Sequence, residues 1–169
     1  MNDGLKNVLE RKGWISDESK CVEFTCVVLP LDTVNRNNRY ISKEVAEKAI
    51  AELKGQPIPC RANMPRTDDV NYPIFENDPR EICGSAQLSI EGDKVVGKLN
   101  MLPDTECPSP ELQKFLIDGL REGTMVPAPY GGGNVSIDEN GVEHMQDDYQ
   151  IYGIGIIDKR RSVFVDLPA

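Results

Sequence analysis

The hydrophobic positions of this chain fall into two patterns, short apolar runs typical of strands and stripes with helical spacing. Residues 22–31 form a run rich in β-branched and apolar side chains, which predicts a buried strand that ends near Pro30. A helix is predicted over residues 43–54, between a capping Ser42 and a terminating Gly55. The apolar stripe of this helix contains Val45, Ala46, Ala49, Ile50 and Leu53.

The second half of the chain repeats both patterns. Residues 82–90 and 95–102 are expected to be strands joined by a hairpin turn across residues 91–94. A second helix is expected to begin with Ser109 as its cap and Pro110 at its first position, and to end at Gly123. Its predicted inner stripe contains Leu112, Phe115, Leu116 and Leu120. Further short strands are expected at residues 57–62, 124–130, 134–137, 149–157 and 162–165.

Three segments lack the periodicity of a core element. Residues 1–20 contain a short amphipathic stretch and are interpreted as an N-terminal arm or helix. Residues 32–40, rich in Asn and Arg, are predicted to be a loop, and residues 64–80, with three prolines, a long loop of the kind that often binds partners. The expected fold is therefore a single α+β domain over residues 21–169, a mostly antiparallel β-sheet or barrel with two main helices.

Charge narrows the classes of partner. The chain has 28 acidic and 19 basic residues, and its net charge of -9 repels phosphate backbones and anionic membrane surfaces. No apolar run approaches the ~20 residues needed to span a bilayer, and residues 1–6 lack the apolar stretch of a secretion signal. We therefore expect a soluble protein, made in the cytoplasm, that binds neither nucleic acid nor membrane.

Metal and cofactor patterns are also missing from the sequence. The five cysteines are widely and irregularly spaced, and with a single histidine they form no zinc-binding pattern, so no metal or other cofactor is expected. Cys21 and Cys26, in or beside an apolar run, are expected to be small buried hydrophobes. The paired acidic residues form no ordered calcium loop. The glycine run at 131–133 lacks the Lys-Ser or Lys-Thr of a phosphate-binding loop and predicts a tight turn or bulge.

Several short motifs resemble a known family. Residues 35–41, Asn-Arg-Asn-Asn-Arg-Tyr-Ile, and the helix that follows them resemble the N-x-N-G-R-x-Y-P loop and first helix of the prohead core proteases of tailed phages, relatives of the herpesvirus assemblin proteases. Residues 84–98 are similar to the central hairpin of that family. Asp104-Thr105, residues 112–123 and the glycine run resemble its later helix and active-site strand. The likeness covers roughly residues 22–158 and implies the protease fold of that family.

The same resemblance implies that the protease chemistry has been lost. In that family a histidine just after the first helix activates a serine on the strand after the second helix, and acyl transfer needs both. The resemblance places Met64 at the histidine position and Pro127 or Ala128 at the serine position. None of these side chains can transfer a proton at neutral pH. Met64, Pro127 and Ala128 are therefore interpreted as vestigial catalytic positions.

Two other residues remain as alternative catalysts. His144, the sole histidine, is expected to be an exposed turn residue beside Glu143, or alternatively a new general base. Cys60 is expected to be structural, or alternatively a nucleophile. Its neighbour Arg61 lowers a thiol pKa but cannot accept the thiol proton. With either residue, the chain would be an active prohead maturation serine or cysteine peptidase with a displaced site.

The leading hypothesis is a non-enzymatic phage head protein, a catalytically inactive relative of the prohead protease. It would act as capsid decoration, as cement or with the scaffold, binding the major capsid protein or other head proteins. We expect a dimer or trimer, assembled in the host cytoplasm and located in the virion capsid. The basic cluster 159–161 would reach an acidic face of a partner or remain solvated. A third possibility is an inhibitory or host-interaction module that regulates an active protease.

Overall fold

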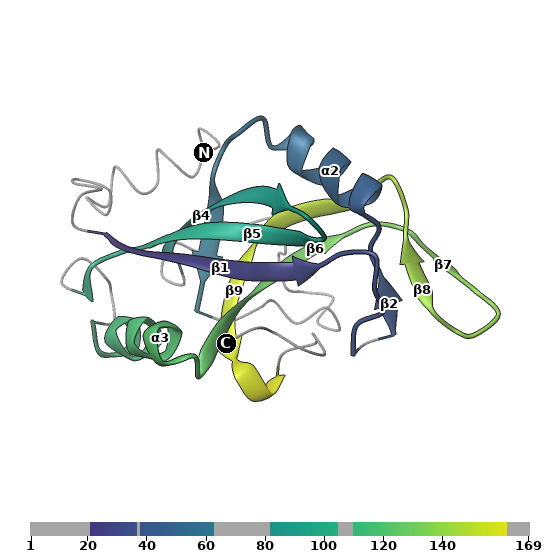
Figure 1. Cartoon of the computed structure of the whole chain (residues 1–169). Coiled ribbons are helices and arrows are strands. Elements are labelled where there is room, and N and C mark those ends of the chain that lie inside the picture. Colours follow the sequence, from purple (N-terminus) through teal and green to yellow (C-terminus); the bar gives the residue numbers. More distant parts are fainter. Residues whose placement is uncertain (1–20, 37, 63–81, 105–109, 162–169) are drawn as a thin grey trace, which may run out of the picture.

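The computed structural model describes residues 21–36, 38–62, 82–104 and 110–161. Within these ranges the chain forms a six-stranded sheet, a three-stranded sheet and the helices α2 and α3 (Figure 1). This confirms the α+β class with two main helices. The predicted N-terminal arm, the cap Ser109, the loop 64–80 and the strand 162–165 lie outside the described residues.

The large sheet is mixed and curls on itself. All of its neighbouring strands are antiparallel except β3 and β9, which are parallel. The strands at the two ends of the order, β1 and β6, approach each other, so that the sheet forms a half-barrel. In spatial order its strands are β1 (Val22–Pro30), β5 (Lys94–Met101), β4 (Ile82–Glu91), β3 (Ile58–Arg61), β9 (Gln150–Asp158) and β6 (Met125–Gly132).

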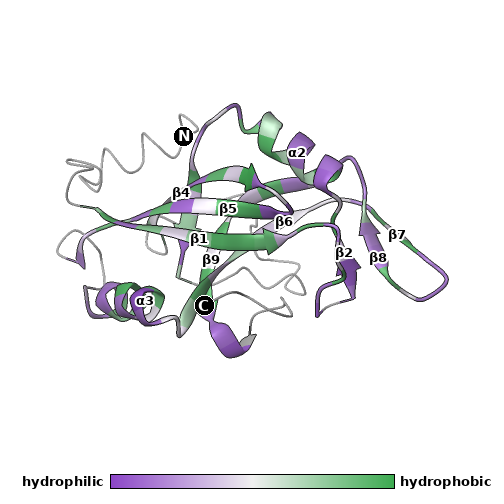
Figure 2. Ribbon diagram, viewed as in Figure 1, coloured by the Kyte–Doolittle hydropathy of each residue, from purple (hydrophilic) through white to green (hydrophobic). Residues whose placement is uncertain are grey.

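The core lies along this curled sheet. Val28 and Leu99 on one side of the strand order, and Ile154 and Ile156 on β9, are completely buried. Removing this apolar surface from water is worth roughly 25 cal/mol per Å², which makes it the main favourable contribution to folding. Figure 2 shows hydrophobic residues along the strands, whereas the short helix η3 (Lys159–Arg161) at the end of β9 is hydrophilic.

Helix α2 (Lys43–Glu52) forms as the sequence predicts. The Ser42 hydroxyl accepts a hydrogen bond from the Val45 N–H at 3.2 Å, which satisfies one of the unpaired donors of the first turn. Val45, Ala46 and Ala49 are buried, as expected from the stripe. Figure 1 shows this helix above the curled sheet and α3 below it.

Helix α3 (Pro110–Glu122) has the predicted limits but a different buried face. Leu116 is buried, as expected, whereas Leu112 is 45% exposed and Phe115 is 61% exposed. The inner side instead contains Gln113, Leu116, Ile117 and Gly119. The predicted stripe was therefore wrong at Leu112 and Phe115.

Two close contacts explain this orientation of α3. The Gln113 side-chain amide donates hydrogen bonds to the carbonyl groups of Cys83 and Leu102, each at 2.8 Å. At Gly119 the helix lies directly against Met125 of β6, where a Cβ atom would overlap the methionine side chain. A buried amide that satisfies strand carbonyls and a close glycine contact fix the helix face more strongly than two apolar side chains do.

The three-stranded sheet was only partly predicted. It consists of β2 (Arg39–Tyr40), β8 (Glu143–Met145) and β7 (Val135–Ile137), with β2 parallel to β8 and β8 antiparallel to β7. β2 lies inside the segment predicted to be a loop, and β8 was not predicted. An ion pair between Arg39 and Glu143, at 2.9 Å, connects the two segments.

Two smaller predictions have opposite outcomes. The glycine run contains a β-bulge, because the register of β6 against β9 shifts between Tyr130 and Gly131, as predicted. Cys21 and Cys26 are only partly buried, in contrast to the buried positions expected for them.

The contacts of Gln113 lead to a stability prediction. Replacing it by methionine, of similar size, removes the side-chain donor from the carbonyls of Leu102 and Cys83, of which Cys83 keeps the Leu102 N–H, and should lower the free energy of unfolding by about 1–2 kcal/mol. The matched control is Lys114→Met, an exposed position on the same helix, which should change stability by less than about 0.5 kcal/mol. Urea unfolding followed by circular dichroism measures both. Equal effects of the two substitutions would contradict the role given to Gln113.

Candidate functional site

Ala128, one of the predicted vestigial positions, lies in a row of paired residues that crosses three adjacent strands of the large sheet. Arg61 on β3 is paired with Gly155 on β9, and Gly155 is paired with Ala128 on β6. Directly paired residues project from the same face of a sheet, so these three positions share one face. The resemblance placed the family serine on this stretch of β6.

The two described vestigial positions carry no reactive group. Ala128 is 0% exposed, and its side chain is a methyl group that can neither attack a carbonyl nor transfer a proton. Pro127 is also buried and is paired with Ile156. Met64, the predicted counterpart of the family histidine, lies outside the described residues. Its assignment as a vestigial position remains a prediction.

A cation and an aromatic ring lie beside Ala128. Tyr130, two residues further along β6 and on the same face, is 6% exposed, and Arg61 is 1% exposed. The guanidinium carbon of Arg61 lies 6.0 Å from the centroid of the Tyr130 ring, within the range of a cation–π interaction. The Tyr130 ring covers Gly153, where a Cβ atom would lie 2.8 Å from Cε1 of the ring. Large side chains therefore occupy this face.

Arg61 and Tyr130 were not singled out by the sequence analysis as site residues. A signal was present, since Arg61 directly follows the apolar strand residues 58–60, where a charged side chain is unusual. An arginine is always protonated, so it can bind an anion but cannot serve as a general base. The row therefore contains a buried cation, but it does not provide a nucleophile with a base.

Cys60 lies on β3, directly before Arg61. Neighbouring residues of a strand point to opposite faces, so the Cys60 thiol faces away from the row that contains Arg61 and Ala128. It is completely buried, and this burial raises its pKa well above the ordinary value. The nucleophilic form is the thiolate, which a raised pKa disfavours at neutral pH. This environment supports the structural interpretation of Cys60.

His144 is held by a carboxylate in the small sheet. Its Nε2 atom lies 2.9 Å from Oδ2 of Asp138, and its ring centroid lies 5.1 Å from that of Tyr40. His144 is therefore a strand residue of β8, whereas a turn residue beside Glu143 was expected. The hydrogen bond to His144, followed by the one from the Val142 N–H, lowers the pKa of Asp138. Asp138, six residues earlier, was not recognised as the partner because strand β8 was not predicted.

The hairpin of β7 and β8 places a serine opposite this histidine. Ser136 is the cross-strand partner of His144, so both side chains share one face of the hairpin. Among the described residues, no hydrogen bond joins the Ser136 hydroxyl to the histidine ring. The group thus contains an oriented imidazole but no activated nucleophile. It belongs to the small sheet, whereas Ala128 and Cys60 belong to the large one.

The described residues contain neither a metal-binding cluster nor a membrane-spanning helix. Within them, no group of three or more His, Cys, Asp or Glu side chains is placed to hold a metal ion. No helix in this part of the chain is both long and apolar enough to cross a membrane.

The burial of Cys60 can be tested by chemical labelling. Under native conditions iodoacetamide should modify the partly exposed Cys21 much faster than Cys60, because a buried thiol with a raised pKa is both inaccessible and protonated. Cys83, which is also buried, serves as an internal control and should remain unmodified like Cys60. Peptide mapping by mass spectrometry gives the rate at each site. Labelling of Cys60 at the rate of Cys21 would reopen its assignment as a nucleophile.

Comparison with known proteins gives a structural match without a sequence match. No protein-family model matches the chain. No curated protein matches it in sequence.

One structural match is to a phage enzyme. The chain is similar to the structure of the bacteriophage T4 capsid assembly protease gp21, with a TM-score of 0.64 and 19% sequence identity. The superposition covers 79% of this chain and 79% of the T4 protein. At this identity the likeness concerns the fold. The chain therefore has a prohead-protease-like fold, as its short motifs predicted.

Proposed function

We propose that this chain is a non-enzymatic phage head protein that uses a prohead-protease-like fold to bind other head proteins. The observation that carries the proposal is that Pro127 and Ala128, the two positions at which the resemblance places the family serine, are buried and unreactive. The fold it shares with the T4 capsid assembly protease supports an association with a phage head.

The surroundings of Ala128 support the same proposal. A nucleophilic serine must meet a substrate carbonyl and a base within hydrogen-bonding distance. Here the neighbouring side chains on the same face are Arg61, a permanent cation, and Tyr130, whose ring covers Gly153. The chemistry of these side chains does not suit peptide hydrolysis. It suits a packed, buried strand that stabilises the fold of a binding protein.

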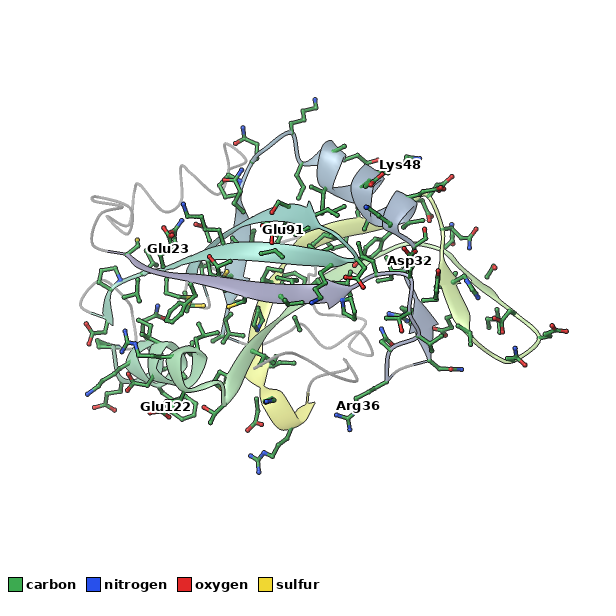
Figure 3. All side chains as sticks on the ribbon, in the orientation of Figure 1. Glu23, Asp32, Arg36, Lys48, Glu91 and Glu122 are labelled. Carbon is green, nitrogen blue, oxygen red and sulfur yellow. The ribbon has the colours of Figure 1, made fainter. Side chains whose placement is uncertain are left out.

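The proposed partners are the major capsid protein or other head proteins, and the proposed location is the virion capsid. The chain would act as decoration, cement or a scaffold-associated subunit, assembled in the host cytoplasm as a dimer or trimer. Its described surface mixes charges of both signs, for example in the ion pairs Lys98–Glu23 and Arg121–Asp118. Figure 3 shows labelled charged side chains on several elements, among them Lys48 on α2 and Glu122 on α3. Such a mixed surface favours protein partners over a polyanion.

One observation favours a second candidate function, an active peptidase with a displaced site. Asp138 orients the His144 ring, as a carboxylate orients the base of a catalytic triad, and Ser136 lies across the hairpin from this histidine. Activity through this group would require the serine hydroxyl to reach the free ring nitrogen of His144.

A single mixing experiment separates the two functions. Purified protein is incubated with proheads and unprocessed capsid and scaffold proteins, then centrifuged. We expect the chain to sediment with the proheads and the precursor bands to remain intact on gels. An active prohead protease serves as the positive control for cleavage, and proheads alone show the background.

Matched variants make the outcome specific. His144→Ala and Ala128→Ser should behave like the original chain, because neither residue belongs to a working nucleophile and base pair in our account. Cleavage that disappears in the His144→Ala variant would establish the displaced peptidase. Intact precursors with no sedimentation of the chain would leave neither proposal standing.

A further inference from the structure

Among the described residues, no strand pairs with the outer edge of the small sheet. β7 is the last strand in the order β2, β8, β7. The Asn134 carbonyl accepts from the Gln146 N–H, and the Asp138 N–H donates to the Val142 carbonyl, so these two backbone groups lie on the side of β8. Backbone direction alternates along an antiparallel strand. The N–H and C=O groups of Val135 and Ile137 therefore point away from β8, toward the open edge.

The side chains of this edge are apolar and exposed. Val135 is 38% exposed and Ile137 is 67% exposed. Edge strands of monomeric proteins are usually protected by a lysine, a proline or an inward charge, because an open edge can pair with another strand. The strand Val135–Ile137, with the sequence Val-Ser-Ile, has none of these protective residues. Figure 1 shows the hairpin of β7 and β8 extending from the end of the molecule opposite α3.

We propose that β7 pairs with β7 of a second copy of this chain, antiparallel and about a two-fold axis that passes beside Ser136. In this register Val135 pairs with Ile137 of the second copy, Ser136 with Ser136, and Asn134 with Asp138. The outward backbone groups of Val135 and Ile137 then form reciprocal hydrogen bonds. The two small sheets join into one continuous sheet across the dimer.

The sequence of the strand makes a second copy the best occupant of this edge. A two-fold pairing must be self-complementary. If residue i of one copy pairs with residue j of the other, residue j of the first copy pairs with residue i of the second. Here β-branched residues meet each other and a serine meets a serine. The Asn134 amide and the Asp138 carboxylate are already hydrogen-bonded within their own chain, to Asp148 and to His144, so the pairing does not depend on them. No two like charges are directly opposite within residues 134–138, although the whole chain carries a net charge of -9. This proposal specifies the dimer named in the proposed function, but it concerns the edge strand alone, so its failure would leave the proposed binding of head proteins intact.

A contact of this length belongs to the class of small, weak interfaces. The dimer should therefore depend on protein concentration, and a trapping experiment is the appropriate test. Ser136→Cys places two thiols on the two-fold axis in a non-hydrogen-bonded pair, where the Cα atoms are about 4.5 Å apart and a disulfide can form. Ile137→Cys is the matched control. Each new thiol of that variant faces Val135 of the other copy, and the native cysteines are the same in both variants.

Mild oxidation, non-reducing gels and mass spectrometry of the linked peptides measure the result. We expect a dimer linked through position 136, formed at least about tenfold faster than any link through position 137. Equal linking of both variants, or no link at position 136, would overturn the register. Circular dichroism of both variants checks that they are folded.

Sedimentation velocity tests the edge without new cysteines. Ile137→Lys adds a protective charge to the edge and removes one partner of the apolar pair, so the dimer dissociation constant should rise at least about tenfold. Phe115→Lys is the control, because it removes a similarly exposed apolar side chain from α3, which is not part of the small sheet. It should leave the dimer dissociation constant unchanged. A dimer weakened only by the α3 variant, or a chain that stays monomeric at all concentrations, would refute the proposal.

Discussion

The parallel pairing of β3 with β9 is the contact on which the rest of the structure depends. It joins the antiparallel group of β1, β5, β4 and β3 to the antiparallel pair of β9 and β6, so without it the large sheet would be two separate pieces. Its register also determines the candidate site. A slip of one residue would turn Arg61 to the opposite face and bring Cys60 opposite Ala128 through β9. The apolar burial of β9, with Ile154 and Ile156 fully enclosed, holds this register in place.

The register shows which positions our proposal concerns: the protease-like fold remains, and the proposed loss is that of the nucleophile and its base. The fold depends on buried strands and on the helix α3, which its hydrogen-bonded Gln113 and its close contact at Gly119 attach to the sheet. The chemistry depends on a few polar groups on one face. On that face this chain has a methyl group, a guanidinium and a tyrosine ring, which satisfy the packing without supplying a nucleophile and base. A binding role places fewer demands on these positions than a catalytic role does.

The local pattern of apolar and polar residues was sufficient to predict the main helices and strands. It was insufficient to predict the contacts between them. The strands of the β4 and β5 hairpin, the cap at Ser42 and the limits of α3 follow from neighbouring residues, and all were predicted. The buried face of α3 depends on Gln113 reaching carbonyls of β4 and of the residue after β5, which no local spacing reveals. Strands β2 and β8 are short and lie about a hundred residues apart in the chain, so no local sequence pattern indicates that they pair. The same missing strand concealed Asp138 as the partner of His144.

The central claim is that this fold contains no activated serine. Reaction with a fluorophosphonate, which modifies only serines made nucleophilic by a nearby base, tests it directly. After incubation at neutral pH, intact-mass spectrometry should show the unmodified chain, while an active serine peptidase in the same tube acquires one adduct. A stoichiometric adduct that maps to Ser136 and is lost in the His144→Ala variant would contradict the account and identify the chain as an enzyme.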